Sequence, residues 1–200
     1  MNIHSVTASV APTADSDKRE AILDAALTLF AERTFDGTPV PLVAETAGVA
    51  AGTIYRYFPS KEALVNALYR RWKGEMQRTL VEAVAGGSTV REQFGLIWRG
   101  LWRFAVDHPR AIAFIETHHH AAYLDDESRA LAAEIDAQTT AFVHASQASG
   151  AIREVEPGTL LALVMGAFTG LVKRAGADGL RYDEAAVRQT EEMMWSALKK

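Results

Sequence analysis

The chain has 200 residues, of which 48% are hydrophobic and 23% charged, with a formal net charge of −4 at pH 7. This balance predicts a folded chain of one or two domains, and the negative charge argues against a general nucleic-acid coat protein. The absence of cysteine excludes a disulfide scaffold, a thiol nucleophile and thiolate metal ligands, and it fits a reducing cytoplasm.

The first predicted helix follows a short N-terminal tail. Residues 1–16 have neither a basic start nor a continuous apolar core, so they do not resemble a signal peptide and are expected to form a flexible tail. Asp17 and Glu20 then have the spacing of a capping box, and an apolar stripe follows. We therefore expect a helix from residue 17 to about residue 33.

Residues 38–61 contain two short helical patterns. In the first, apolar residues recur at i, i+3, i+4 and i+7, namely at Val40, Val43, Ala44 and Ala47. Thr38 is expected to cap this helix, with Pro39 at the first helical position, where a missing N–H costs nothing. Gly48 can end the helix in the left-handed conformation, and Val49 is expected to anchor the turn in the core.

The second pattern carries the polar residues of this segment. Ile54 and Phe58 are spaced i, i+4 and should point inward, which leaves Thr53, Tyr55, Arg56 and Tyr57 facing outward. Ser60 is a good cap for the next helix, and Lys61 at that helix N-terminus favours a phosphate. Two such helices joined by a glycine turn form a helix-turn-helix, whose second helix lies in the DNA major groove. We therefore predict DNA binding.

Residues 17 to about 73 closely resemble the DNA-binding domain of the TetR (tetracycline-repressor) family of bacterial transcriptional regulators. The run that carries the resemblance is A-G-V-A-A-G-T-I-Y-R-Y-F-P-S-K-E-A-L at residues 47–64. The resemblance implies that Tyr55, Tyr57 and Lys61 contact the DNA backbone or base edges, and it implies a transcriptional regulator, most commonly a repressor.

The sequence departs from the family pattern at two places. Ala50 and Ala51 stand where the family usually has serine and a polar residue, and Pro39 follows Thr38 where it often has Thr-Thr. Base recognition is therefore expected to depend on the residues that follow the bare helix start. The predicted DNA-binding residues are Thr38, Gly52, Thr53, Tyr55, Arg56, Tyr57 and Lys61.

The chain is acidic overall, which disfavours DNA binding, but its basic residues are concentrated in one segment. Residues 49–73 contain one acidic residue, Glu62, and five basic ones, namely Arg56, Lys61, Arg70, Arg71 and Lys73. Because DNA affinity depends on neutralising phosphates, we predict a local basic patch on an acidic body.

The remaining two thirds of the chain also has helical patterns. A long helix is expected from Ser60 to the break at Gly86-Gly87, followed by helices at about 89–107, 109–122, 126–148, 157–175 and 183–198. The predicted fold is all-α, with about nine helices. It consists of a helix-turn-helix domain over residues 17–76 and a larger ligand-binding and dimerisation domain over residues 77–200.

The last two helices are the predicted dimer surface. Gly166, Ala167 and Gly170 allow another helix to approach closely, and apolar area is supplied by Leu163, Met165, Phe168, Leu171, Met193, Met194 and Trp195. Packing within one chain is the alternative. A homodimer suits the mechanism, because two reading heads must reach half-sites about 34–36 Å apart on a pseudo-palindromic operator. The longest apolar run, residues 160–172, is shorter than the about 20 residues of a membrane span, so no membrane partner is expected.

Aromatic residues in the central helices predict a pocket for a small, largely apolar effector. The predicted ligand-binding residues are Trp98, Trp102, Phe114, His118, Tyr123 and Phe142. Aromatic residues at helical spacing are also typical of an ordinary core. The resemblance implies that an effector bound there releases the operator by favouring another dimer spacing.

His118, His119 and His120 raise the question of a metal site. Consecutive helical residues are about 100° apart, so the three side chains cannot converge on one ion. Glu116 and His119 have the Glu-x-x-His spacing of di-iron bundles, but the sequence contains no second copy. We expect no metal, no cofactor and no catalytic residue, in a cytoplasmic protein. An all-helical metal-dependent enzyme and a protein-interaction adaptor are the alternatives.

Overall fold

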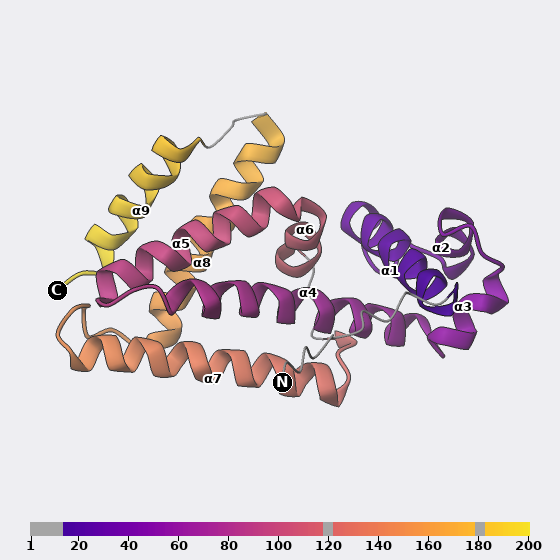
Figure 1. Cartoon of the computed structure of the whole chain (residues 1–200), viewed down its shortest axis with the longest axis horizontal. Helices are drawn as coiled ribbons and strands as arrows, with labels where there is room; N and C mark the ends of the chain where they lie inside the picture. Colours follow the sequence, from indigo (N-terminus) through magenta and orange to yellow (C-terminus); the bar gives the residue numbers. More distant parts are fainter. Residues whose placement is uncertain (1–13, 118–121, 179–182) are drawn as a thin grey trace, which may run out of the picture. The chain divides into compact units, whose positions relative to one another are not determined.

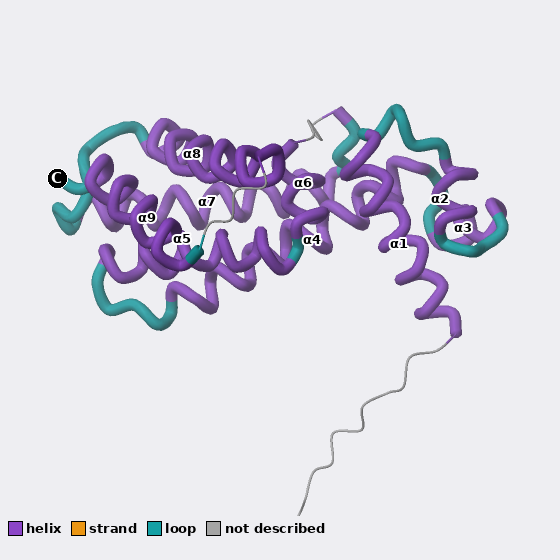
Figure 2. Tube along the Cα trace, turned by 90° about the horizontal axis from the view of Figure 1, so that it is seen from above, coloured by secondary structure: helices purple, strands orange, loops and turns teal. Residues whose placement is uncertain are grey.

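The computed structural model describes residues 14–117, 122–178 and 183–200. In these ranges the chain forms nine helices and one isolated β-bridge between Ile152 and Lys199, and Figure 2 accordingly shows helices joined by loops. The all-α prediction is confirmed. The chain divides into two compact units, Met1–Val65 and Asn66–Lys200.

The first unit contains α1 (Ala14–Arg33), α2 (Val40–Thr46), α3 (Ala51–Tyr57) and the start of α4 (Lys61–Val84). Its core combines the apolar stripe of α1 with inward residues of the other helices, among them Ile22, Phe30, Val43, Ile54, Phe58 and Leu64. The first helix begins at Ala14, earlier than the capping-box pattern at Asp17 predicted, so the expected tail is helical over residues 14–16. Residues 1–13 lie outside the described part of the chain.

The second unit contains the rest of α4 together with α5 (Val90–Asp107), α6 (Pro109–Thr117), α7 (Asp126–Ala148), α8 (Pro157–Asp178) and α9 (Glu184–Leu198). These bounds follow the helices expected from the sequence closely, except that α6 ends at Thr117 where we expected a helix to about residue 122, and residues 118–121 lie outside the described part of the chain. Figure 1 shows α7 running alongside α4 in the same direction, and a 2.8 Å hydrogen bond from Gln77 Nε2 to Gln138 Oε1 joins the two helices. Trp98, Leu101 and Phe168 are fully buried at the centre of this unit.

A buried carboxylate holds α9 against α5. The Glu191 side chain, 4% exposed as a residue, accepts hydrogen bonds from Arg91 at 2.6 Å and from Arg99 at 2.5 Å. Gly95 leaves the space that this carboxylate occupies, because a Cβ there would lie 2.6 Å from Glu191 Oε1. Trp98 Nε1 also donates to Thr190 Oγ1 at 3.2 Å. Since a buried charge requires partners, these contacts specify how α9 seats on α5.

The beginning of α7 is tied to α4 by polar side chains. Asn66, 2% exposed, donates to the Tyr123 carbonyl at 2.8 Å and accepts from the Asp125 N–H at 2.9 Å. Asp125 caps α7 by accepting from the Ser128 N–H at 2.8 Å, and Arg70 donates to the Asp125 carboxylate at 2.9 Å. Partial desolvation raises the pKa of Asp125, but hydrogen bonds from Ser128 and Arg70 outweigh it and lower this pKa to about 2.

Helix α8 is apolar but largely uncovered by its own chain. Its segment Pro157–Gly176 is long and apolar enough, by length and composition, to cross a membrane, with a mean hydropathy of 1.3. This stretch is longer than the run 160–172 from which we expected no span. Only 11% of the window is buried within the unit, so the helix presents apolar surface that another molecule can cover.

Candidate nucleic-acid interface and effector cavity

The turn between α2 and α3 has the geometry that the sequence predicts. Gly48 has a φ of +67°. The Gly48 N–H donates to the Glu45 carbonyl at 3.1 Å, and the Val49 N–H donates to the Ala44 carbonyl at 3.0 Å. This pair of bonds is the Schellman motif, which satisfies the free carbonyls at a helix end. The helix-turn-helix is therefore confirmed, with α2 joined to α3 by a specified hinge.

Thr38 has a different role from the one expected. Its residue exposure is 0%, and its hydroxyl donates to the carbonyl oxygens of Thr34 at 2.8 Å and Leu29 at 3.3 Å. Pro39, which makes no side-chain cap bond, is the N-cap of α2, so the prediction that Thr38 caps this helix is wrong. The hydroxyl instead satisfies carbonyls at the end of α1, where a β-branched residue fills the buried corner.

Helix α3 presents its predicted outward face to solvent. Ile54 and Phe58 are buried as expected, whereas Tyr55 is 52% exposed and a Cβ at Gly52 would meet no atom within 4 Å. The N-cap of α3 is Ala50, which makes no side-chain cap bond, and the Thr53 N–H of the first turn donates to the Ala50 carbonyl at 2.8 Å. The bare helix start expected from the sequence is present.

Arg56 and Tyr57 are held by a carboxylate that the sequence patterns did not identify. Arg56 Nη2 donates to Tyr57 Oη at 2.7 Å, and both side chains bind the Asp15 carboxylate at the start of α1. The Arg56 guanidinium also lies 4.9 Å from the centroid of the Tyr57 ring. The hydrogen bond to Asp15 raises the pKa of the Tyr57 hydroxyl, and the bond to Tyr57 raises the pKa of Arg56.

This cluster could not be read from sequence spacing. Asp15 is separated from Arg56 by 41 residues, and it lies before the residue at which we expected the first helix to begin. All three side chains are partly or largely exposed, so the cluster is a surface ion pair that another anion can replace.

Lys61 lies at the start of α4, as predicted, but its ammonium has a partner. Ser60 Oγ accepts from the Ala63 N–H at 3.1 Å, which confirms Ser60 as the cap of this helix. The Lys61 Nζ atom lies 4.1 Å from the centroid of the Phe35 ring, in the turn after α1. This cation–π contact positions the Lys61 side chain beside the N-terminus of α4.

The predicted basic patch is smaller than the count of residues indicates. Arg70 binds Asp125 at 2.9 Å, and the Lys73 ammonium lies 3.8 Å from a Glu116 carboxylate oxygen. Both belong to the second unit, in which their charges are matched by carboxylates. The basic patch of the first unit therefore consists, in α3 and the described start of α4, of Arg56 and Lys61.

The second unit contains an elongated apolar groove between α4, α5 and α7, extended by residues of α8 and α9. It has two lobes of about 240 Å³ each. Most of their shared wall is formed by Lys73, Met76, Leu80, Ile97, Ile135 and Phe142. Lys73, Met76 and Leu80 recur at i, i+3 and i+7 on α4, which is the spacing of one helix face. That spacing was available in the sequence and could have identified this wall.

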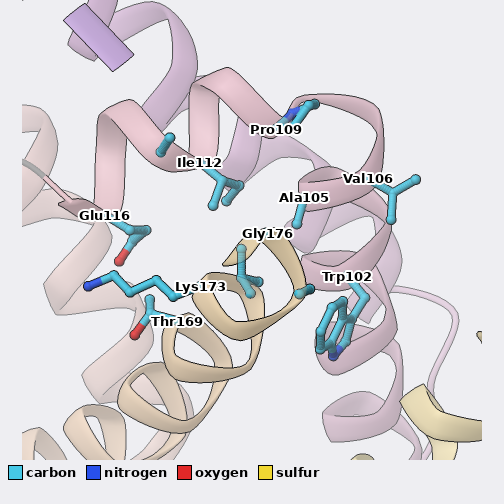
Figure 3. A pocket seen from close by; sticks show the side chains of 12 residues that line it. Trp102, Ala105, Val106, Pro109, Ile112, Glu116, Thr169, Lys173 and Gly176 are labelled. Carbon is cyan, nitrogen blue, oxygen red and sulfur yellow. The ribbon is translucent and has the colours of Figure 1, made fainter. Parts of the chain in front are cut away.

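A separate cavity of about 350 Å³ lies between α5, α6 and α8. Figure 3 shows Trp102 and Ile112 in its wall, with Lys173 extending along the wall toward Glu116. Tyr69, which is 7% exposed, lies on α4 near these charges. Burial raises the pKa of its hydroxyl, and the carboxylates of Asp136 and Glu116 raise it further. Acidic and basic groups thus meet where α4, α6 and α7 approach one another.

The predicted ligand residues are distributed over several places. Phe142 lines the groove and Trp102 lines the separate cavity. Trp98 and Phe114 are buried in the core, and the Tyr123 carbonyl accepts from Asn66. His118 lies outside the described residues, as do His119 and His120. Among the described residues no group of three or more His, Cys, Asp and Glu side chains has the arrangement of a metal site.

Two family models match the chain. The model of the bacterial regulatory proteins of the tetR family matches residues 22–68, and the model of the tetracyclin repressor-like C-terminal domain matches residues 70–200. Together they cover both units of the structure.

The curated relatives match different shares of the chain. The chain is 42% identical over 76 residues to the transcriptional repressor KstR of Mycolicibacterium smegmatis, a match that spans 38% of this chain and 37% of that relative. It is 34% identical over 76 residues to the fatty acid metabolism regulator protein of Bacillus subtilis, spanning 38% and 39%. An uncharacterized HTH-type regulator of Haemophilus influenzae is 23% identical over 187 residues, spanning 94% and 98%. The match to each of the first two therefore spans little more than a third of the relative's length.

A solved structure extends the similarity to both units. A TetR family transcription regulator from Marinobacter aquaeolei is 25% identical, with a TM-score of 0.84, and the match covers 93% of this chain and 97% of that one. Its helical fold is the same as that of the chain described here.

Proposed function

The chain belongs to the TetR family of bacterial regulatory proteins, and on this premise we propose that it is a ligand-responsive transcriptional repressor that binds its operator as a homodimer. The observation that carries the DNA-binding part is the Schellman hinge at Gly48, which presents the outward face of α3 on a braced helix. Named relatives of the chain are transcription regulators, a class that generally has no catalytic activity.

Base recognition comes from the exposed face of α3. Gly52, Thr53, Tyr55 and Arg56 lie where hydroxyl groups and a guanidinium can reach base edges. Tyr57 and Lys61 supply further backbone contacts. Thr38 does not contact DNA in this proposal, because its side chain is buried; it contributes to the packing beneath the DNA-binding surface.

The apolar groove of the second unit is the effector site. Its wall is almost wholly apolar with few polar groups, which is the composition of a small-molecule pocket. The relatives from Mycolicibacterium and Bacillus are named as a repressor and as a regulator of fatty acid metabolism, and a response to apolar metabolites fits this wall. Binding of an effector there favours a dimer that no longer fits the operator.

The homodimer forms through α8 and α9. Leu163 and Met193 are 50% and 66% exposed, and a Cβ at Gly166 or Gly170 would meet no atom within 4 Å. An apolar helix that its own chain leaves uncovered requires a partner, and a second copy supplies the same surface by symmetry. Phe168, by contrast, is 0% exposed and belongs to the core rather than to this surface. We place this regulator in the cytoplasm, where the operator is.

Selection of DNA duplexes from a random-sequence pool by the purified full-length chain tests this function. Enriched duplexes should contain an inverted repeat whose half-sites lie about one helical turn apart, because a two-fold dimer reads two-fold symmetric DNA. The mass of the complex on an enriched duplex, measured by analytical ultracentrifugation, should correspond to an even number of chains. Recovery of unenriched, random duplexes would contradict operator binding.

A further inference from the structure

Among the described lining residues, the positive charge of the effector groove is confined to one side chain. Among the described residues that line the two lobes, Lys73 is the only cation, and it lines both of them. From Lys73 the groove continues along α4 past Met76 and Leu80 to Val84, an apolar path. The groove thus has the form of an amphipathic site, with an amine toward one end and an apolar channel leading from it.

Lys73 is held only loosely by its carboxylate partner. The 3.8 Å separation of Lys73 Nζ from Glu116 Oε1 is longer than the about 2.7–2.9 Å of a charge-assisted hydrogen bond. Both side chains are mostly covered, with exposures of 22% and 16%, so solvent screens this pair only partly. A carboxylate of better geometry can therefore compete with Glu116 for Lys73.

Glu116 has a second cation within its surroundings. It does not line the groove but lines the cavity between α5, α6 and α8, together with Lys173 of α8. Lys173 is exposed, and Figure 3 shows its side chain directed along the wall toward Glu116. Glu116 on α6 thus stands between a lysine of α4 and a lysine of α8.

We propose that the effector is an amphipathic carboxylate with an elongated apolar body, and that its carboxylate replaces Glu116 as the partner of Lys73. Glu116 then pairs with Lys173, so that no buried carboxylate is left without a cation. This inference rests on the proposed function and names the ligand class of its groove.

The chemistry of the wall favours an anionic head over the alternatives. A cationic head would lie beside Lys73 and be repelled, and a neutral head could separate Lys73 from Glu116 only by leaving both charges poorly paired. Asp136 also lines the groove, but its side chain is exposed, so water screens its repulsion of an entering carboxylate.

The exchange of ion-pair partners would let ligand binding in the groove change the contacts between helices. Lys73 lies on α4, the helix that begins at Lys61, and Glu116 lies on α6. In the free protein the ion pair joins α4 to α6, whereas in the bound protein the corresponding pair joins α6 to α8. A ligand that binds the second arrangement more tightly shifts the population toward it.

Binding of three probes with the same chain length tests the proposal: dodecanoate, dodecanol and dodecyltrimethylammonium, each below its micelle concentration. Trp195 lines the groove, so tryptophan fluorescence of the full-length dimer reports occupancy. We expect dodecanoate to bind about tenfold more tightly than dodecanol, the difference made by one charge-assisted hydrogen bond, and the ammonium probe to bind most weakly. Dodecanoate should also weaken binding to the selected operator.

Two substitutions have opposite expected effects. Lys73→Met should remove the preference for dodecanoate over dodecanol and leave dodecanol binding unchanged. Glu116→Gln should strengthen dodecanoate binding severalfold, because it removes the competing carboxylate, again without effect on dodecanol. Lys18→Met, an exposed lysine of α1, is the matched control and should change neither. Circular dichroism of each variant verifies the fold.

Failure of the carboxylate proposal can be distinguished from failure of the proposal that the groove is the effector site. If dodecanol binds as tightly as dodecanoate, or if both substitutions affect the two probes alike, the carboxylate proposal is overturned and the apolar effector groove stands. If the ammonium probe binds most tightly, the sign of the head group is wrong. If no probe binds while operator binding is intact, the groove is not the effector site and both proposals fail.

Discussion

Arg56 binds the Asp15 carboxylate in the free protein, and in the proposed complex it binds phosphates or base edges of DNA instead. In the free protein Asp15 binds both Arg56 and Tyr57, two of the predicted DNA-binding residues. DNA must displace this carboxylate or accept its repulsion, because an anion near the interface opposes the binding of a polyanion.

Asp15→Asn is therefore expected to tighten operator binding severalfold at low salt, with a smaller gain at high salt, where the charge is screened. Fluorescence anisotropy on a selected duplex measures the dissociation constants. Asp24→Asn, the same change at an exposed position further along α1, serves as control. A weaker complex with Asp15→Asn would mean instead that Asp15 orients Arg56 for base recognition.

Arg56 and Lys61 are expected to differ in what their loss changes. Lys61→Ala should weaken binding to all sequences and lower the slope of log K against log salt by about one, since it removes one phosphate contact. Arg56→Ala should reduce discrimination between operator and mismatched duplexes on the order of tenfold. Titration of both variants on matched and mismatched duplexes at several salt concentrations separates the effects. If both variants bind the operator as the parent chain does, α3 is not the reading helix.

At the scale of the element, the start of α7 depends on an ionised Asp125. Its hydrogen bonds with Ser128 and Arg70 hold its pKa at about 2, below the ordinary value of 3.8. Because the folded-state pKa is depressed, the stabilisation is complete above pH 3.8 and is lost as the pH falls through 2. Its side chain is 45% exposed, so solvent screening limits the contribution to below about 1 kcal/mol.

Asp125→Asn retains a side chain that can cap a helix but removes the charge. The free energy of unfolding of this variant, from urea titrations, should lie below that of the parent chain at pH 7, and the two should converge as the pH falls from 4 toward 2. Asp126→Asn, one residue further along and exposed, is the control. A difference that persisted undiminished at the lowest pH would show that the charge of Asp125 is not what stabilises α7.

At the scale of the whole molecule, the proposed repressor acts as two copies of the chain. Leu163→Glu combined with Met193→Glu should shift the dimer to monomer at micromolar concentration, because charges would be buried in the proposed interface. Analytical ultracentrifugation measures the shift. Operator affinity should fall with it, since one reading head binds only one half-site.

Val106→Glu adds the same charge at another exposed apolar residue, on α5, and should leave the dimer intact. Preservation of the dimer in the double variant would exclude α8 and α9 as its interface.

The sequence by itself determined the helix-turn-helix and the all-α fold, because their signals are local. The apolar stripe of α2, the glycine at position 48 and the cap at Ser60 each act within a few residues of the chain. Helix bounds from Lys61 to Leu198 follow the same short-range periodicity and capping.

The tertiary structure alone decided which side chains meet. Asp15 reaches Arg56, Glu116 reaches Lys73, and Thr38 turns inward rather than capping α2. The first two contacts join residues that are about 40 positions apart in the chain, so each depends on how whole helices pack. Amphipathic patterns show that a helix has a buried face, but only packing decides whether that face lines a core, a groove or the surface offered to a second chain.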